Sequence, residues 1–160
     1  MKILAGLLVC CTLLFSQTQK LIIDAQNFEA NDKKGISSFD GNVNMEMGKD
    51  KLAANSVDIY FQTNEKTGKK TPQKYIATGS VDFEIISKEK HYKGKGNKVI
   101  YYPSKQEYTV IGNGFIEELN NNRKIYGDRI YVNQVTGEAK VKGSKKEPVR
   151  FIIDIEQGKK

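Results

Sequence analysis

A four-residue phrase that recurs four times constrains the fold of this chain more than any other feature. Each copy has a small residue, then Gln, Asn or Asp, then any residue, then an apolar residue, and the copies begin at Ala25, Ala54, Gly96 and Gly127. A glycine follows three copies at an offset of sixteen residues, at Gly41, Gly112 and Gly143, and follows the second at twenty-five, at Gly79. A repeat of this length indicates stacked supersecondary units that share one continuous core.

Between these phrases the chain alternates apolar and polar residues, as in Val43-Asn44-Met45-Glu46-Met47 and Val81-Asp82-Phe83-Glu84-Ile85. A period of two places one face of a strand in an apolar environment and the other in water. Clusters of Asn, Asp, Gly and Pro separate the runs, and such clusters suit hairpin turns. No segment after residue 16 keeps a helical period over three turns. The sequence therefore predicts an all-β chain of about nine strand-length runs.

Glycines inside the runs predict where the strands bend. Gly41, Gly79, Gly112 and Gly143 each stand within a run, where glycine often marks a bulge or a tight bend. We expect each copy of the phrase to begin a strand pair that bends at its glycine. The prolines at 72, 103 and 148 lie at or near breaks, and we expect none inside a strand. Long strands with matching corners give a sandwich, a jelly roll or a flattened solenoid.

The first sixteen residues differ from the rest of the chain. Lys2 precedes an apolar run from Ile3 to Phe15, which is typical of an export signal and short for a membrane span. We predict a signal peptide over residues 1–16 with cleavage near Ser16; an uncleaved anchor is the alternative. Both cysteines, Cys10 and Cys11, lie in this segment, so the exported chain would contain no disulfide. One domain over residues 17–156 and a basic tail over 157–160 would follow.

The chain is basic, with 26 Lys and Arg against 19 Asp and Glu and a formal net charge of +7. A basic exported protein tends to meet an anionic partner such as lipid head groups, anionic glycans or nucleic acid. Lysines also keep a β-rich surface soluble and protect its exposed edges. Charge alone leaves both interpretations open.

Three phrases connect the chain to a known family: Ala54-Asn55-Ser56-Val57-Asp58-Ile59-Tyr60, Gly41-Asn42-Val43 and Ala77-Thr78-Gly79-Ser80-Val81. Over about residues 21–156 the chain resembles the OstA-like family of lipopolysaccharide transport proteins. The resemblance implies a twisted open β-jelly roll, in which two facing antiparallel sheets hold the acyl chains of lipopolysaccharide between them. It implies a periplasmic, non-enzymatic bridge of head-to-tail protomers between an inner-membrane anchored subunit and an outer-membrane translocon. The polar Thr63–Lys74 insertion departs from the family pattern.

A lipid groove also follows from the alternating runs, because acyl chains need a continuous apolar surface without unpaired polar groups. The candidate lipid-binding residues of the inner face are Val43, Met45, Met47, Val57, Ile59, Val81, Phe83, Ile85, Val99, Tyr101, Ile116, Ile130, Val141, Phe151 and Ile153. A closed sandwich would bury the same residues. The sequence does not distinguish splayed sheets from closed ones.

Five lysines form the densest basic run and are the candidates for contact with glycolipid phosphates: Lys88, Lys90, Lys93, Lys95 and Lys98. A solvated hairpin would show the same composition. His91 is the only histidine, and no Cys or repeated carboxylate accompanies it, so we expect neither a metal ion nor another cofactor. The chain beyond residue 16 contains no Cys nucleophile, no Gly-x-Ser-x-Gly elbow and no phosphate-binding loop, so we expect no enzyme.

The sequence is compatible with three other functions. A membrane-anchored subunit of the same transport system would keep the N-terminal segment. A closed structural or adhesive β-repeat protein would have the same strands without lipid affinity. A nucleic-acid-binding β-domain could stack bases on Tyr92, Tyr101 and Tyr102, but the export signal argues against this, and we expect no nucleic-acid partner.

Overall fold

A computed structural model describes residues 19–158, which form ten β-strands and one short 3-10 helix. The predicted signal peptide lies outside the described residues. The elements are β1 (Leu21–Asp24), β2 (Asn27–Asn31), β3 (Ile36–Met47), β4 (Asp50–Thr63), β5 (Lys70–Ile86), β6 (His91–Tyr102), β7 (Glu107–Glu118), η1 (Leu119–Asn121), β8 (Arg123–Asn133), β9 (Ala139–Lys142) and β10 (Arg150–Ile152). Within the described residues, no helix is both long and apolar enough to cross a membrane.

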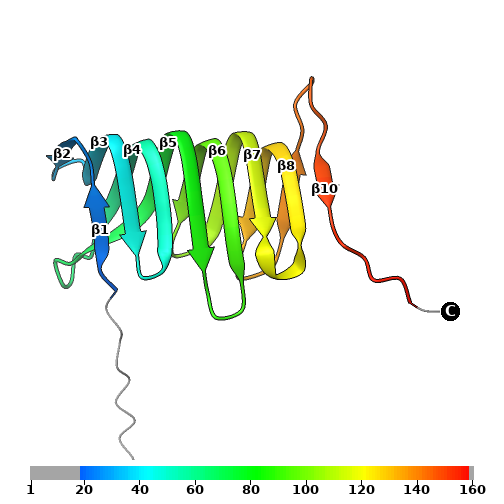
Figure 1. The fold of residues 1–160 in the computed structure, drawn as a ribbon. Coiled ribbons are helices and arrows are strands. Elements are labelled where there is room, and N and C mark those ends of the chain that lie inside the picture. The colour runs from blue at the N-terminus through cyan, green and yellow to red at the C-terminus, as the bar shows by residue number, and fades with distance from the viewer. Residues whose placement is uncertain (1–18, 159–160) are drawn as a thin grey trace, which may run out of the picture.

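The strands form one antiparallel sheet in which neighbours in sequence are mostly neighbours in space. The order is β1-β3-β4-β5-β6-β7-β8-β10, while β2 also pairs with β3 and β9 also pairs with β8 (Figure 1). This simple meander follows from the short hairpin turns, which connect antiparallel strands directly. The all-β prediction is confirmed.

The six long strands bend where their pairing shifts register, and the bends divide the sheet into two facing halves. The shifts fall at Asp40/Val43, Ala53/Ser56, Thr78/Val81, Lys95/Lys98 and Ile111/Gly114 of successive strand pairs. We call the part that contains β1 and β10 half-sheet A, and the part that contains β2 and β9 half-sheet B. Half-sheet A holds residues 43–47, 50–53, 81–86, 91–95, 114–118 and 123–127 of the long strands. The result is the open jelly roll that the family resemblance implies.

The recurrent phrase lies at these bends. Gly79 has φ +84°, and a Cβ placed there would lie 2.5 Å from Nδ2 of Asn55, so the amide of one strand packs on the bare backbone of the next. Asn97 packs on Gly112 in the same way, and Gln26 packs on Gly41. Positive φ and the missing Cβ are both required here, which is why glycine recurs. The recurrent phrase therefore marks the positions where successive strands bend.

The structure corrects three details. Gly143 follows β9 instead of bending a strand, and a Cβ placed there would lie nearest the carbonyl oxygen of Glu147, not the side chain of Asp128. Pro72 lies inside β5, not at a break, but it stands beside the register shift at Tyr60/Phe61, beyond the part of β5 that pairs with β6, so no ladder hydrogen bond to β6 is lost. The corner phrases lie within strands or between β1 and β2, rather than at the start of strand pairs.

The long insertion extends a hairpin. Of the segment from Thr63 to Lys74, only residues 64–69 form the turn, and the rest continues the pairing of β4 with β5. Asn64 organises the turn, because its side-chain oxygen accepts hydrogen bonds from the backbone N–H groups of Lys66 and Thr67. The ion pair between Lys70 and Asp32, at 2.6 Å, ties the hairpin to the neighbouring turn.

Candidate functional site

Burial along the inner face is greatest near the corners and lower at most strand ends, with Glu118 at the end of β7 as an exception. Val43, Val57, Val81, Val110 and Ile130 lie near the corners and are almost completely buried, between 0 and 2% exposed. Toward the strand ends the inner residues become half-buried, as at Met47 of β3 and Ile85 of β5. The two half-sheets therefore close at the corners and splay at the strand ends, which we call the mouth.

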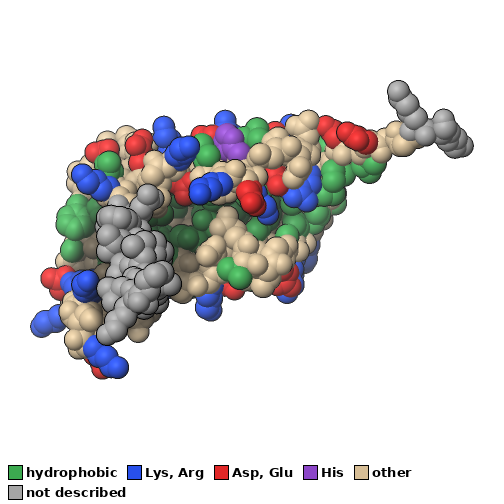
Figure 2. Space-filling view, turned by 90° about the horizontal axis from the view of Figure 1, so that it is seen from below, with side chains coloured by type: hydrophobic (Ala, Val, Ile, Leu, Met, Phe, Trp, Pro, Cys, Tyr) green, Lys and Arg blue, Asp and Glu red, His purple; other side chains and the backbone are tan. Residues whose placement is uncertain are grey.

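A groove runs along the mouth. Figure 2 looks into it and shows hydrophobic side chains deep between two rims of charged side chains. In its first segment about 670 Å³ is free of protein atoms, and part of this volume is open solvent. It is lined almost entirely by apolar and aromatic side chains from β1 and β3 to β7: Leu21, Met45, Met47, Leu52, Val57, Tyr75, Ala77, Phe83, Ile85, Val99, Tyr101 and Tyr108, with Asp50, Lys51 and Glu84 at its edge. This segment offers the continuous apolar surface that an alkyl chain requires.

Three tyrosines form part of this lining in half-sheet B. The ring of Tyr101 stacks on that of Tyr108 with centroids 4.3 Å apart, and lies 5.9 Å from that of Tyr75. Burial, with a smaller contribution from Tyr101, raises the pKa of both Tyr75 and Tyr108. The phenols of Tyr75 and Tyr108 are therefore neutral at physiological pH, and all three rings present flat, largely apolar faces to the groove.

The second segment of the groove, toward β8 and β10, is more polar. Asp50, Ile85, Tyr101 and Tyr108 line both segments, so the groove is continuous. The polar residues found only in the second segment include Ser87, Lys90, Gln106, Glu118, Arg123, Asn133 and Gln134. A polar head group and an apolar chain could therefore occupy different parts of one groove.

Glu118 is the one polar residue among the fully buried side chains of residues 19–158, with 5% of its surface exposed. Nε of Arg123 donates to its Oε2 at 2.7 Å, Nη2 of Arg123 donates to the same oxygen, and Nδ2 of Asn121 donates to Oε1 at 2.9 Å. Both carboxylate oxygens thus have partners, which offsets the cost of burying the charge. Arg123 stays partly exposed at the groove wall.

Most of the predicted lipid-binding residues lie on the inner face. Buried there are Val43, Val57, Ile59, Val81, Phe83, Val99, Ile116 and Ile130, while Met45, Met47, Ile85, Tyr101 and Val141 are half-buried. Phe151, on β10, lines the second groove segment and is 55% exposed at the edge of half-sheet A. Ile153 follows the last residue of β10 and is outside the sheet. Their contact with lipid stays a prediction.

Inner-face residues that the sequence analysis missed complete the lining. They are Leu21, Ile23, Phe39, Leu52, Phe61, Tyr75, Ala77, Tyr92, Tyr108, Val110, Ile125 and Val132. Several share the period of two with a neighbour, such as Tyr75 with Ala77 and Tyr108 with Val110. Tyrosines at the apolar positions of such alternating runs are the sequence feature that could have identified these inner-face residues.

The structure separates the five candidate lysines. Lys90 lines the second groove segment, and Lys88 lies beside it in the hairpin turn between β5 and β6. Lys93 and Lys95 point to the outer face, since Gly94 between them lies under the Phe83 ring on the inner face. Lys98 alternates with buried Val99 and also faces outward. A shared role in head-group contact is therefore limited to Lys88 and Lys90.

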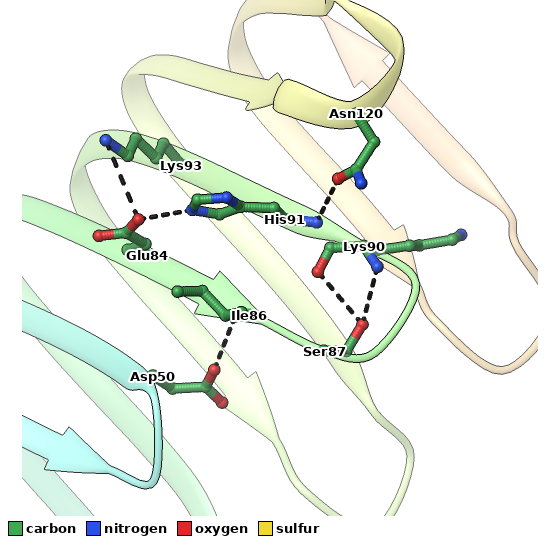
Figure 3. Close-up of polar contacts among 8 residues, drawn as sticks. All are labelled: Asp50, Glu84, Ile86, Ser87, Lys90, His91, Lys93 and Asn120. Atoms are coloured by element: carbon green, nitrogen blue, oxygen red, sulfur yellow. Dashed lines mark hydrogen bonds and ion pairs between the residues drawn. The ribbon is translucent and has the colours of Figure 1, made fainter.

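His91 and Lys93 flank Glu84 on the outer face (Figure 3). Nε2 of His91 lies 2.5 Å from Oε1 of Glu84, and this hydrogen bond is the main cause that lowers the pKa of Glu84. The backbone N–H of His91 donates to the side chain of Asn120 at 2.8 Å, which ties the hairpin to η1. Within residues 19–158, no group of three or more His, Cys, Asp or Glu side chains is arranged to hold a metal ion.

Both ends of the sheet carry unpaired strand edges. Among the described residues, β1 and β2 pair only with β3, and β9 and β10 pair only with β8. Exposed apolar side chains gather at the C-terminal end, where Val149, Phe151, Ile152 and Ile153 are each 42 to 55% exposed. At the other end, Ile22 and Phe28 are 52 and 63% exposed. Such edges are suited to pairing with a further strand.

Comparisons with known proteins agree with this architecture. The sequence model of the family described as "LptA/(LptD N-terminal domain) LPS transport protein" matches residues 22–138. The crystal structure of LptH, the LptA homologous periplasmic component of the lipopolysaccharide transport device of Pseudomonas aeruginosa, has the same fold. It superposes with a TM-score of 0.71 at 16% sequence identity, covering 86% of this chain and 96% of LptH. A search of curated protein sequences finds no significant match. Because the family model spans most of the chain, this protein belongs to the LptA and LptD N-terminal domain family of lipopolysaccharide transport proteins.

Proposed function

We propose that this protein is a periplasmic carrier of lipopolysaccharide and forms part of a protein bridge from the inner to the outer membrane. Membership of the transport family supports this role, and so does the likeness to a periplasmic component of the same system in another organism. The observation that carries the proposal is the continuous groove along the mouth. A transport role needs no catalytic residues.

The groove suits the lipid moiety of lipopolysaccharide. Its first segment has an apolar lining, and each acyl CH₂ buried there would contribute about 0.8 kcal/mol. Met45 and Met47 lie on its wall, and their unbranched side chains adapt to chains that slide past. Arg123 and Lys90 of the second segment are cations within the same groove, and they suit the phosphates of the head group.

Assembly into a bridge would use the open ends of the sheet. Edge strands β9 and β10 of one protomer would pair with β1 and β2 of the next, or with related edges of the inner-membrane subunit and the outer-membrane translocon. A heterologous contact of this kind does not close on itself and gives a filament. The grooves of successive protomers would then follow one another.

Site-specific photocrosslinking in intact cells tests lipid contact. Met45 lines the groove, while its neighbour Glu46 is exposed on the opposite face of β3, so the pair is a matched control. We expect a crosslinker at position 45 to capture lipopolysaccharide and one at position 46 to capture none. Equal capture at both positions, or none at position 45 together with no binding of lipid A by the purified protein, would contradict the proposed function.

A further inference from the structure

A basic hollow lies on the outer face of half-sheet B, on the side of the sheet away from the groove. Its lining comes from β7, β8 and β9: Thr109, Arg129, Tyr131, Lys140 and Lys142. These residues alternate with Val110, Ile130 and Val141, whose side chains face inward. The hollow therefore has no part in the lipid groove.

The hollow contains two like charges placed directly opposite each other. Arg129 of β8 and Lys142 of β9 are cross-strand partners. No carboxylate of residues 19–158 forms an ion pair with either of them, whereas Lys124 farther along β8 pairs with Glu117 at 3.5 Å. Like charges at directly opposed positions destabilise a sheet. Arg129 and Lys142 thus repel each other in the free protein.

Two carboxylates near the hollow already bind members of its lining, and among the described residues Asp128, next to Arg129 in the sequence, forms no ion pair with Arg129 or Lys142. Glu138 binds Nζ of Lys140 at 2.8 Å, and Glu107 accepts a hydrogen bond from the hydroxyl of Tyr131 at 3.0 Å. Nζ of Lys140 also lies 6.0 Å from the centre of the Tyr131 ring. These contacts hold Lys140 and Tyr131 in place and leave the charges of Arg129 and Lys142 uncompensated.

We propose that this hollow binds a phosphate group, carried by a free phosphate compound or by a lipid head group. A guanidinium binds phosphate through two parallel hydrogen bonds, and an ammonium adds a compact charge. The hydroxyl of Thr109 supplies a neutral donor in the same lining. A dianion between Arg129 and Lys142 would also replace their repulsion with two attractions. The site is independent of the proposed function, because it lies on the opposite face of the sheet.

Thermal unfolding of the purified protein in sodium phosphate tests the site. A ligand that binds only the folded state raises the Tm as its concentration increases. Sodium chloride at equal ionic strength controls for screening of the repulsion, and the Arg129→Gln/Lys142→Gln protein in the same salts controls for the general stabilisation that phosphate gives to folded proteins. We expect phosphate to raise the Tm more than chloride does, and calorimetric titration to give saturable binding. Equal shifts in the two salts would overturn the proposal.

Single substitutions in the hollow test whether phosphate binds there. Arg129→Gln and Lys142→Gln should each weaken phosphate binding about tenfold or more, as expected for the loss of one charge-assisted contact. Without phosphate, each should raise the Tm, because the repulsion is gone. Lys124→Gln, on the outer face of half-sheet A, removes the same charge from the same strand and should change phosphate binding less than twofold. Equal weakening by Lys124→Gln would show a general charge effect and overturn the site.

Vesicles distinguish the two sources of phosphate. Sedimentation with phosphatidylglycerol vesicles, compared with phosphatidylcholine vesicles, reports binding to an anionic lipid surface. If Lys142→Gln reduces sedimentation with phosphatidylglycerol, the site takes lipid head groups; if only inorganic phosphate binding falls, it takes soluble phosphate. If neither falls, the proposal is wrong, whatever crosslinking at position 45 shows about the groove.

Discussion

At the scale of single residues, the groove depends on polar side chains that the fold keeps neutral or paired. Tyr108 is stacked on Tyr101, and burial raises its pKa well above the ordinary value of 10. Glu118 is buried at an inner-face position, where Arg123 and Asn121 donate hydrogen bonds to its two oxygens. Both residues can face an apolar ligand only while these conditions hold.

Tyr108 makes stability sensitive to alkaline pH. Its raised pKa means that the folded state keeps the proton when the unfolded state has lost it. This contribution is fully present below pH 10 and is lost as pH rises through the folded-state pKa. We expect Tyr108→Phe to shift alkaline unfolding, followed by circular dichroism, to higher pH. Tyr126→Phe, at a side chain 39% exposed, is the control, and an equal shift there would contradict the assignment.

Arg123→Met should destabilise the protein because it leaves the buried carboxylate of Glu118 without its main partner. Arg123 is 40% exposed, so solvent reduces the loss, and we expect about 2 kcal/mol in the free energy of urea unfolding. The double variant with Glu118→Met should recover most of this loss, since no buried charge remains. Failure of the double variant to recover stability would show that Arg123 acts by packing alone.

At the scale of the elements, each long strand is two half-strands joined by a corner. At the corner, the amide side chain of one strand packs on a glycine of the neighbouring strand, as Asn55 of β4 packs on Gly79 of β5. Alternation continues on both sides of the register shift, so both half-strands present apolar residues to the same interior. The bend, more than the turn chemistry, creates the groove.

Gly79→Ala tests the corner. Gly79 and Gly68 both have positive φ, +84° and +67°, but a Cβ at Gly68 meets nothing within 4 Å, while at Gly79 it meets Asn55. Backbone strain costs about 1–2 kcal/mol at either site, and the close approach adds to it only at Gly79. We expect Gly79→Ala to lower the free energy of unfolding in urea clearly more than Gly68→Ala. Equal losses would mean that only φ matters at the corner.

At the scale of the whole molecule, the sheet is an open-ended stack. Its two ends carry exposed apolar residues, at Ile22 and Phe28 on one side and at Phe151 and Ile152 on the other, on strands that have no outer partner among residues 19–158. A single protomer therefore leaves both its edges and the ends of its groove available. Figure 1 shows these ends at opposite sides of the molecule.

Phe151→Asp should weaken head-to-tail assembly. The substitution places a charge on the C-terminal edge, where pairing with the next protomer would bury it, and the loss of one interface anchor corresponds to about a thirtyfold weaker association. Sedimentation equilibrium over a range of protein concentrations measures this. Val135→Asp is the control, because Val135 is 68% exposed in the turn between β8 and β9 and belongs to neither edge strand β9 nor edge strand β10. Unchanged association of the Phe151 variant would exclude this edge from the interface.

The sequence by itself determined the local features of this protein. Alternation identified the strands and most inner-face residues, such as Val43 and Phe83, because a period of two is a property of the backbone. The recurrent phrase located three corners, because positive φ and close approach demand glycine at Gly41, Gly79 and Gly112.

Only the tertiary structure decided how the half-sheets stand to each other. The tertiary packing separates the half-sheets at the mouth, places Glu118 and Arg123 in the groove, and places Lys93 and Lys95 on the outer face. It also ended the repeat at Gly143, where the chain leaves the sheet before β10. The angle between the half-sheets, the depth of the groove and the face on which a side chain lies depend on packing between segments far apart in the sequence. No local sequence pattern encodes the angle between these segments.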